Sequence, residues 1–115
     1  MYPNDEVALS DLVVAFEKGL YSQAEALYLE AKNIIAQNPG KHHPEYASHL
    51  NSLAVLYQKQ SEYTKAEPLY LEARDIKAKA LGKKHPGYAL SLNNLAGLYE
   101  DQGEYTKAEP PFFRS

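Results

Sequence analysis

The 115-residue sequence contains no cysteine and no tryptophan, and only one methionine. Without cysteine the chain can form neither a disulfide nor a thiolate metal site. It also has no apolar run approaching the roughly 20 residues of a membrane-spanning helix, and residues 1–6 carry acidic side chains where a secretory signal would be basic. The lack of a membrane span and of a basic leader leads us to expect a soluble, cytoplasmic protein, and the length of 115 residues predicts a single small domain.

An excess of positive charge is missing as well. The sequence has 12 Lys and Arg against 15 Asp and Glu, for a formal net charge of −3. A strongly basic surface is the usual property of a protein that binds nucleic acid or an anionic membrane. We therefore expect neither as a partner.

What the sequence does contain is a tandem repeat. Residues 21–62 and 63–104 match at 24 of 42 positions without a gap, which chance does not supply. Upstream of Tyr21 the match continues once one residue is dropped between Phe16 and Tyr21. This shift pairs the apolar residues Leu9, Leu12, Val13 and Phe16 with Leu50, Leu53, Ala54 and Tyr57.

The repeats divide the chain into two full units and part of a third. We expect one domain over 1–115, with repeat 1 at about 3–42, repeat 2 at about 43–84 and partial repeat 3 at about 85–115. The third unit has its first helix and a second helix that is cut short, because Pro110 and Pro111 follow its opening turn. The array is thus predicted to be five helices long.

Each unit shows two stretches with the apolar spacing i, i+3, i+4, i+7 of an amphipathic helix. In repeat 2 the stripe of the first helix is Leu50, Leu53, Ala54 and Tyr57, and the stripe of the second helix is Ala66, Leu69, Tyr70 and Ala73, with Ile76 one turn further on. Nine of the 10 Tyr residues fall on repeated register positions. We therefore interpret these tyrosines as core residues.

Residues at the helix ends support this division. Ser22 with Glu25, Thr64 with Glu67, and Thr106 with Glu109 fit the capping box that opens a helix. Pro44 and Pro86 suit the start of a first helix, and Gly40 and Gly82 suit the end of the helix before it. Pro68 falls close enough to the start of its helix to be tolerated there.

The paired helices, with small residues at Ala54, Ala66 and Ala73, resemble the tetratricopeptide repeat, whose usual unit has about 34 residues. The 42-residue unit, the segment Leu92–Tyr99 and the run GKKHP at 82–86 look like the kinesin light chain type of this repeat. The resemblance covers nearly the whole chain. It implies an all-α, right-handed superhelix of antiparallel helix pairs, and a non-enzymatic module for protein–protein interaction.

Such a superhelix holds an extended peptide or a partner helix in a concave groove, which the resemblance implies is lined by the first helix of each repeat. The candidate groove residues are Ser10, Val14, Glu17, Lys18, Ser48, Asn51, Val55, Gln58, Lys59, Asn93, Gly97 and Glu100. Asn51 and Asn93 are available to bond to a peptide backbone, and the alternative, which does not exclude this, is that they bridge adjacent helices or cap a local backbone group. Lys18 and Lys59 have Glu100 and Asp101 as counterparts, so no lysine clamp for a carboxylate is visible.

Chemistry-bearing motifs are absent. His42 and His43 are adjacent in a turn and His85 lies one repeat later, so we interpret them as helix-start residues and predict no metal site. The basic group Lys79, Lys83, Lys84 and His85 is interpreted as a solvated helix end. The sequence has no phosphate-binding glycine loop and no nucleophile elbow. We expect no catalytic residue and no cofactor.

Two other interpretations remain open. The uncovered C-terminal end could make the chain a self-associating module, either a homodimer or a domain-swapped assembly. The candidate self-association residues are Leu92, Leu95, Leu98, Tyr99, Phe112 and Phe113. The chain could also be a regulatory fragment of a larger signalling protein, as occurs among bacterial relatives.

Overall fold

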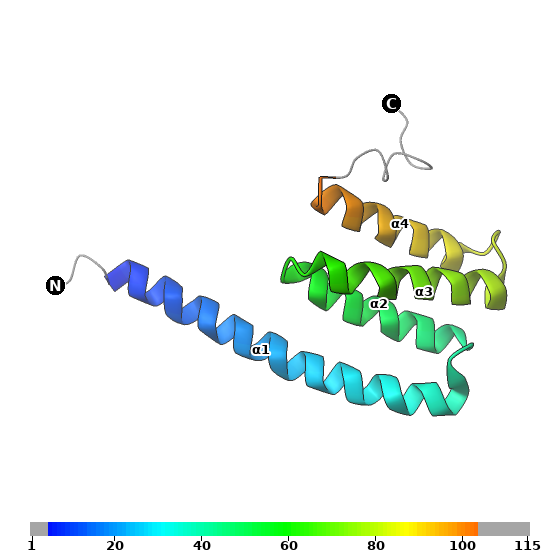
Figure 1. Ribbon diagram of the computed structural model, residues 1–115, viewed down its shortest axis with the longest axis horizontal. Coiled ribbons are helices and arrows are strands. Elements are labelled where there is room, and N and C mark those ends of the chain that lie inside the picture. The colour runs from blue at the N-terminus through cyan, green and yellow to red at the C-terminus, as the bar shows by residue number, and fades with distance from the viewer. Residues whose placement is uncertain (1–4, 104–115) are drawn as a thin grey trace.

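The computed structural model describes residues 5–103, with side chains described from Glu17 onward. It contains α1 (Asp5–Ile35), a π-helical segment η1 (Ala36–Gly40), α2 (Pro44–Lys59), α3 (Tyr63–Leu81) and α4 (Pro86–Asp101). Helix α2 packs on α1 and α3, and α4 packs on α3 (Figure 1). Within the described residues the fold is an all-α helical-repeat solenoid, as predicted. The fifth helix, expected from Thr106, lies outside them.

The first unit differs from the expectation of two helices. No turn forms between Phe16 and Tyr21, and α1 runs without a break for 31 residues. Three of the four intervening residues, Glu17, Lys18 and Leu20, favour the helix, and Gly19 costs only about 1 kcal/mol relative to alanine. The N-terminal half of α1 therefore extends away from α2, α3 and α4 (Figure 1).

Helix ends follow the repeat. His43 and His85 are the N-caps of α2 and α4, and their Nδ1 atoms accept hydrogen bonds from the backbone N–H of Glu45 (3.0 Å) and Gly87 (2.8 Å). Pro44 and Pro86 begin these helices. Gly82 ends α3 with φ +92°, in the region that glycine tolerates best. The interpretation of these histidines and prolines as helix-start residues is confirmed.

Two of the three predicted capping boxes are wrong, and the third, Thr106 with Glu109, lies outside the described residues. Ser22 and Glu25 lie inside α1, which is already helical there. Helix α3 begins at Tyr63, after Glu62, with no hydrogen bond from a capping side chain. Thr64 therefore lies inside the first turn of α3. Glu67 accepts a hydrogen bond from the Tyr99 hydroxyl instead of capping the helix. Pro68 is tolerated inside α3, as expected.

The apolar stripes of repeat 2 form the core. One cluster joins α2, α3 and α4, and a second joins α2 and α3 near the other end of the helices. The first cluster contains Leu53, Ala54, Leu56, Tyr57, Ala66, Tyr70, Leu95 and Leu98. The second contains Tyr46, Ala47, Leu50, Ala73 and Ile76. The register assignments of repeat 2 are thereby confirmed.

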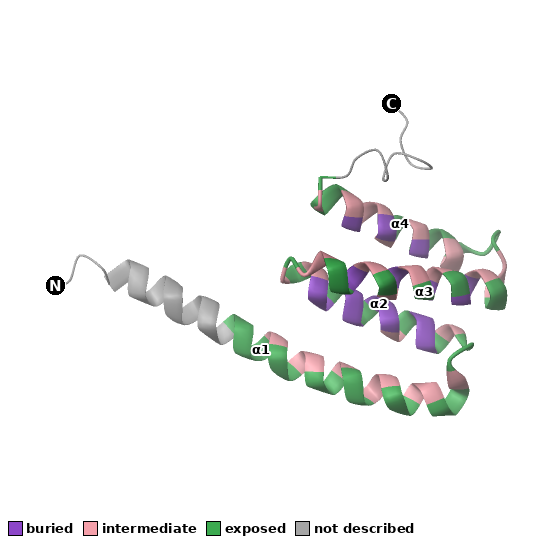
Figure 2. Ribbon diagram, viewed as in Figure 1, coloured by how far each residue is buried: buried purple, intermediate pink, exposed green. Residues whose placement is uncertain are grey.

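The same stripe is open on α1. Figure 2 shows buried residues along α2, α3 and α4, whereas none of the described residues of α1 is buried. Leu27 and Ile34 are 67% and 61% exposed, while Ile76, which matches Ile34 in register, is 9% exposed. The difference arises because α2 packs on one side of this part of α1, and no first helix of its own unit packs on the other side.

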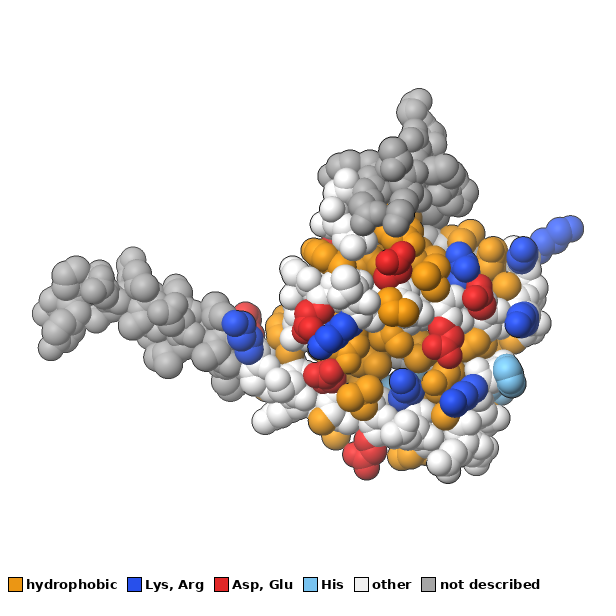
Figure 3. All heavy atoms as spheres, viewed as in Figure 1, with side chains coloured by type: hydrophobic (Ala, Val, Ile, Leu, Met, Phe, Trp, Pro, Cys, Tyr) orange, Lys and Arg blue, Asp and Glu red, His pale blue; other side chains and the backbone are white. Residues whose placement is uncertain are grey.

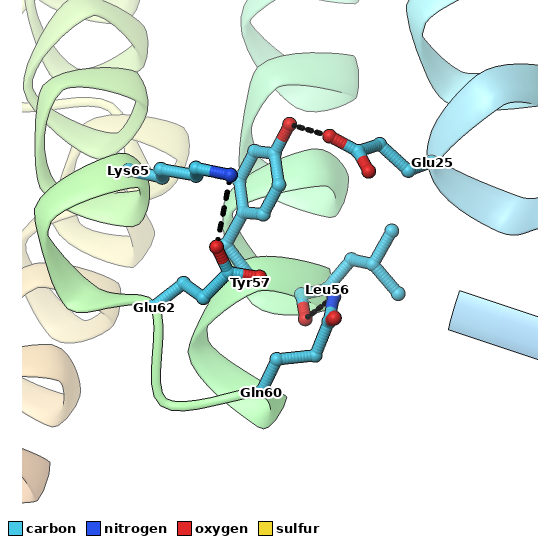
Figure 4. A network of polar contacts seen from close by, with 6 residues as sticks. All are labelled: Glu25, Leu56, Tyr57, Gln60, Glu62 and Lys65. Atoms are coloured by element: carbon cyan, nitrogen blue, oxygen red, sulfur yellow. Dashed lines mark hydrogen bonds and ion pairs between the residues drawn. The ribbon is translucent and has the colours of Figure 1, made fainter. Parts of the chain in front are cut away.

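A tyrosine-to-glutamate hydrogen bond recurs from one unit to the next. The hydroxyl of Tyr57 on α2 donates to Glu25 on α1 (2.5 Å), and the hydroxyl of Tyr99 on α4 donates to Glu67 on α3 (2.7 Å). Lys65 lies 5.5 Å from the centroid of the Tyr57 ring (Figure 4). Each bond joins the first helix of one unit to the second helix of the preceding unit.

We predict that Tyr57→Phe lowers the free energy of unfolding by about 1–2 kcal/mol, because it removes a partly buried hydrogen bond to a carboxylate. Urea unfolding followed by circular dichroism measures the change. Tyr63→Phe is the matched control, because no hydrogen bond of the Tyr63 hydroxyl is found among the described residues. Equal stabilities of the two variants would contradict a stabilising role for the Tyr57–Glu25 bond.

Stability should also fall in alkali. Burial, followed by the hydrogen bond and charge of Glu25, raises the pKa of Tyr57 to about 12, and burial and the Asp101 charge raise the pKa of Tyr70 to about 12. Because the pKa of each tyrosine is higher in the folded chain than its ordinary value of 10, the neutral hydroxyls favour the folded state. This contribution to the free energy of unfolding is complete below pH 10 and is lost as the pH rises from 10 to 12. Urea unfolding at pH 8, 10 and 11 should show a loss of the order of a few kcal/mol. A urea midpoint that stays the same from pH 8 to pH 11 would contradict this contribution of the two tyrosines.

Candidate protein-interaction surface

The groove candidates on α2 lie along one stripe with graded exposure. Ser48 and Lys59 are exposed, Val55 is 38% exposed, and Gln58 is half-buried. Asn51 is only 8% exposed. The stripe therefore presents a shallow polar and apolar surface around one buried amide.

The candidates on α4 occupy the same register one unit later. Asn93 and Glu100 are exposed and Gly97 is half-buried. Leu90, which matches Ser48 in the repeat, is 52% exposed. Because α2 and α4 contact each other, these residues continue the α2 stripe onto the next unit.

Gln58 has a structural role that its groove assignment did not include. Its Oε1 accepts a hydrogen bond from the Tyr70 hydroxyl at 2.8 Å, and its Nε2 donates to a carboxylate oxygen of Asp101. It thereby links α2 to both α3 and α4. Sequence reasoning missed Asp101 as a partner, because its register counterpart is Lys59 and the pairing needs the stacked helices.

Asn51 is the one asparagine of the stripe with an unsatisfied buried atom. Its Oδ1 is buried and accepts no hydrogen bond in the structure. Among the described residues, no side-chain hydrogen bond joins Asn51 or Asn93 to a neighbouring helix. The alternative that these asparagines bridge adjacent helices therefore has no support in this arrangement, and a buried acceptor without a donor is destabilising.

The predicted groove residues of the first unit do not lie beside those of α2 and α4. The backbone of Ser10 and Val14 lies on the part of α1 that extends away from the other helices (Figure 1), and their side chains lie outside the description. Glu17 and Lys18 are exposed and line a cleft of about 530 Å³ with Lys59, Gln60, Ser61 and Glu62, together with Tyr21 and Ser22. The expectation that the first helices of all three units stack side by side is thus wrong here, because α1 does not turn back.

Charge on the molecule is mixed. Figure 3 shows acidic and basic side chains interspersed among hydrophobic ones on the visible face, with neither sign gathered into a large patch. Over the described residues, no three His, Asp or Glu side chains are placed to hold a metal ion. In the same part of the chain, no helix is long and apolar enough to cross a membrane.

The self-association candidates on α4 are less exposed than an uncovered apolar face would be. Leu95 and Leu98 belong to the core cluster, with 6% and 0% exposure. Leu92 and Tyr99 are half-buried, and the Tyr99 hydroxyl is bonded to Glu67. Phe112 and Phe113 lie outside the described residues. Self-association through this end stays a prediction.

Comparison with known proteins agrees with the helix pairs. The tetratricopeptide repeat family profile matches the sequence twice, over residues 13–78 and 46–112. The chain belongs to the tetratricopeptide repeat family. No curated protein gives a significant match to the sequence. The repeats of this family are generally protein-interaction modules on a non-enzymatic scaffold.

A solved relative specifies the type of repeat. The chain is similar to the crystal structure of BtubC (BKLC) from P. vanneervenii, with a TM-score of 0.70 and 26% sequence identity. The match covers 86% of this tetratricopeptide repeat chain and 40% of that one, so the sequence spans less than half of its relative's length. The similarity supports a repeat of the kinesin light chain type.

We predict that Gln58→Ala destabilises the repeat by about 1–2 kcal/mol, since it removes two side-chain hydrogen bonds and leaves the Tyr70 hydroxyl without its acceptor. Lys59→Ala, at the exposed neighbouring position, is the control and should change stability by less than about 0.5 kcal/mol. Thermal and urea unfolding measure both. Loss of the same stability in both variants would show that the link between the three helices contributes nothing.

Proposed function

We propose that this tetratricopeptide repeat chain binds an extended peptide or a partner helix, in the cytoplasm, on the face formed by α2 and α4. The proposal includes no catalysis and no cofactor. It is carried by one observation: Val55 and Leu90, both exposed apolar side chains, lie among the polar residues Ser48 and Asn93 on two helices in contact. Apolar side chains surrounded by polar ones are typical of a docking surface.

The chemistry of the surface indicates what kind of peptide fits it. Lys59 carries positive charge near one end of α2, and Glu100 carries negative charge at the matching end of α4, so a peptide of strong single-sign charge gains little. Because Leu90 matches Ser48 in register, it lies about two helical turns from the level of Val55, and two apolar side chains of a peptide, one against each, would remove both from water. Backbone N–H groups of the peptide could then satisfy the Asn51 carbonyl once its side chain turns toward the surface.

The test uses fluorescent peptides selected from a random peptide display library on the full chain. We expect Val55→Asp with Leu90→Asp to weaken binding at least about tenfold, since a buried charge opposes docking of an apolar anchor. Fluorescence anisotropy measures the affinity, and circular dichroism confirms that the variant is folded.

A second variant and a control complete the test. Asn51→Ala with Asn93→Ala should weaken binding by a smaller factor, because it removes only hydrogen-bonding groups. Lys79→Ala, exposed on α3 away from the proposed face, should bind like the unaltered chain. If no peptide binds saturably, or if the aspartate variant binds as tightly as the Lys79→Ala control, the proposal is wrong.

A further inference from the structure

An apolar face of the first unit is covered on one side only, where α2 packs against Ala24 and Tyr28, while Leu27 remains 67% exposed. Ala24, Leu27, Tyr28 and Ala31 on α1, together with His49 on α2, line a hollow of about 370 Å³. Ala66, Tyr70 and Ala73, the register counterparts of Ala24, Tyr28 and Ala31, are at most 1% exposed on α3. The same residue pattern is thus fully buried in one unit and only half-buried in the other.

The second unit shows what covers such a face. There Leu53, Ala54 and Tyr57 of α2 belong to the same core cluster as Ala66 and Tyr70 of α3. By the repeat register, the residues of unit 1 that match this covering stripe are Leu9, Leu12, Val13 and Phe16. The occupant that fits the open face is therefore a segment that the chain itself contains, residues 5–16.

That segment is not placed to cover the face of its own chain. Residues 5–16 and the open stripe at residues 24–34 are two parts of one continuous helix, and a straight helix cannot fold onto itself. In Figure 1 the N-terminal half of α1 extends away from the other helices. Residues 5–16 can therefore reach such a face only on a second molecule.

The connection between the two halves of α1 favours this arrangement. In unit 2 the turn from Tyr57 to Tyr63 has five intervening residues, with Ser61 at φ +62°, and in unit 3 the equivalent Gly103 has φ +80°. Unit 1 has only four residues between Phe16 and Tyr21, so the same turn cannot form with the same register. A short connection that strains a closed hairpin is a recognised cause of domain swapping.

We infer that the chain forms a domain-swapped dimer in which residues 5–16 of each protomer lie on the open face of its partner. Two α1 helices would then run antiparallel and cross near Lys18 and Gly19, because Leu12 of one would meet Ala24 of the other. The exchange is reciprocal, as a two-fold dimer requires. It buries the apolar face of both protomers and supplies the missing first helix of each solenoid. It holds whether or not the proposed peptide binds to α2 and α4.

The oligomeric state and a designed disulfide test this inference on the full chain. Light scattering coupled to size exclusion should give twice the 12.9 kDa chain mass. Since the chain contains no cysteine, Leu12→Cys combined with Ala24→Cys introduces the only thiols. Mild oxidation should yield a covalent dimer on a non-reducing gel. The register-matched control, Leu53→Cys with Ala66→Cys, should yield an intrachain bond and a covalent monomer.

A hinge variant separates the swap from any other dimer. Inserting one Gln between Lys18 and Gly19 restores the five-residue connection and should convert the dimer to a monomer of unchanged or higher helix content. Lys18→Gln, which leaves the length unaltered, should remain dimeric. Three results would each overturn the inference: a monomeric unaltered chain, a disulfide formed within one chain by the Leu12→Cys, Ala24→Cys variant, or a dimer that survives the insertion.

Discussion

A second helix in this solenoid buries its apolar face fully only where the first helix of its own unit lies on it. Helix α3 meets that condition, since α2 covers Ala66, Tyr70 and Ala73. Residues 21–35 of α1 carry the same pattern but are covered by α2 alone, and Leu27 and Ile34 remain exposed. Because helical repeats contact only their neighbours, this local condition decides the state of each unit separately.

Specific polar contacts then set how one unit sits on the next. The Tyr57–Glu25 and Tyr99–Glu67 hydrogen bonds join equivalent residues across two successive boundaries, each pair separated by 32 positions in the sequence. Gln58 adds a link from α2 to α3 and α4. Apolar burial supplies most of the stability, and these directional contacts favour one register of stacking over others.

The repeat register made the helical pairs, the His43 and His85 caps and the buried stripes of unit 2 predictable from the sequence. Two features were not. The stretch Glu17–Leu20 can be either a tight turn or helix, and local propensity favours the helix while the repeat favours the turn. Glu25 and Glu67 fit a capping motif equally well in sequence, and their bonds to tyrosine exist only once the units are stacked.

Of the groove candidates, the exposed positions on α2 and α4 were foreseeable, whereas the role of Gln58 and the displacement of Ser10 and Val14 depend on tertiary contacts.

The continuity of α1 through residues 17–20 is the feature on which the open first unit depends. Backbone carbon chemical shifts of these residues, from solution NMR, test it most directly. The account predicts an unbroken run of helical shifts from Glu17 to Leu20, with the non-helical values of a turn confined to sites such as Ser61. Turn-like shifts at Gly19 matching those of Ser61 would show that the first unit closes on itself, and would contradict the account.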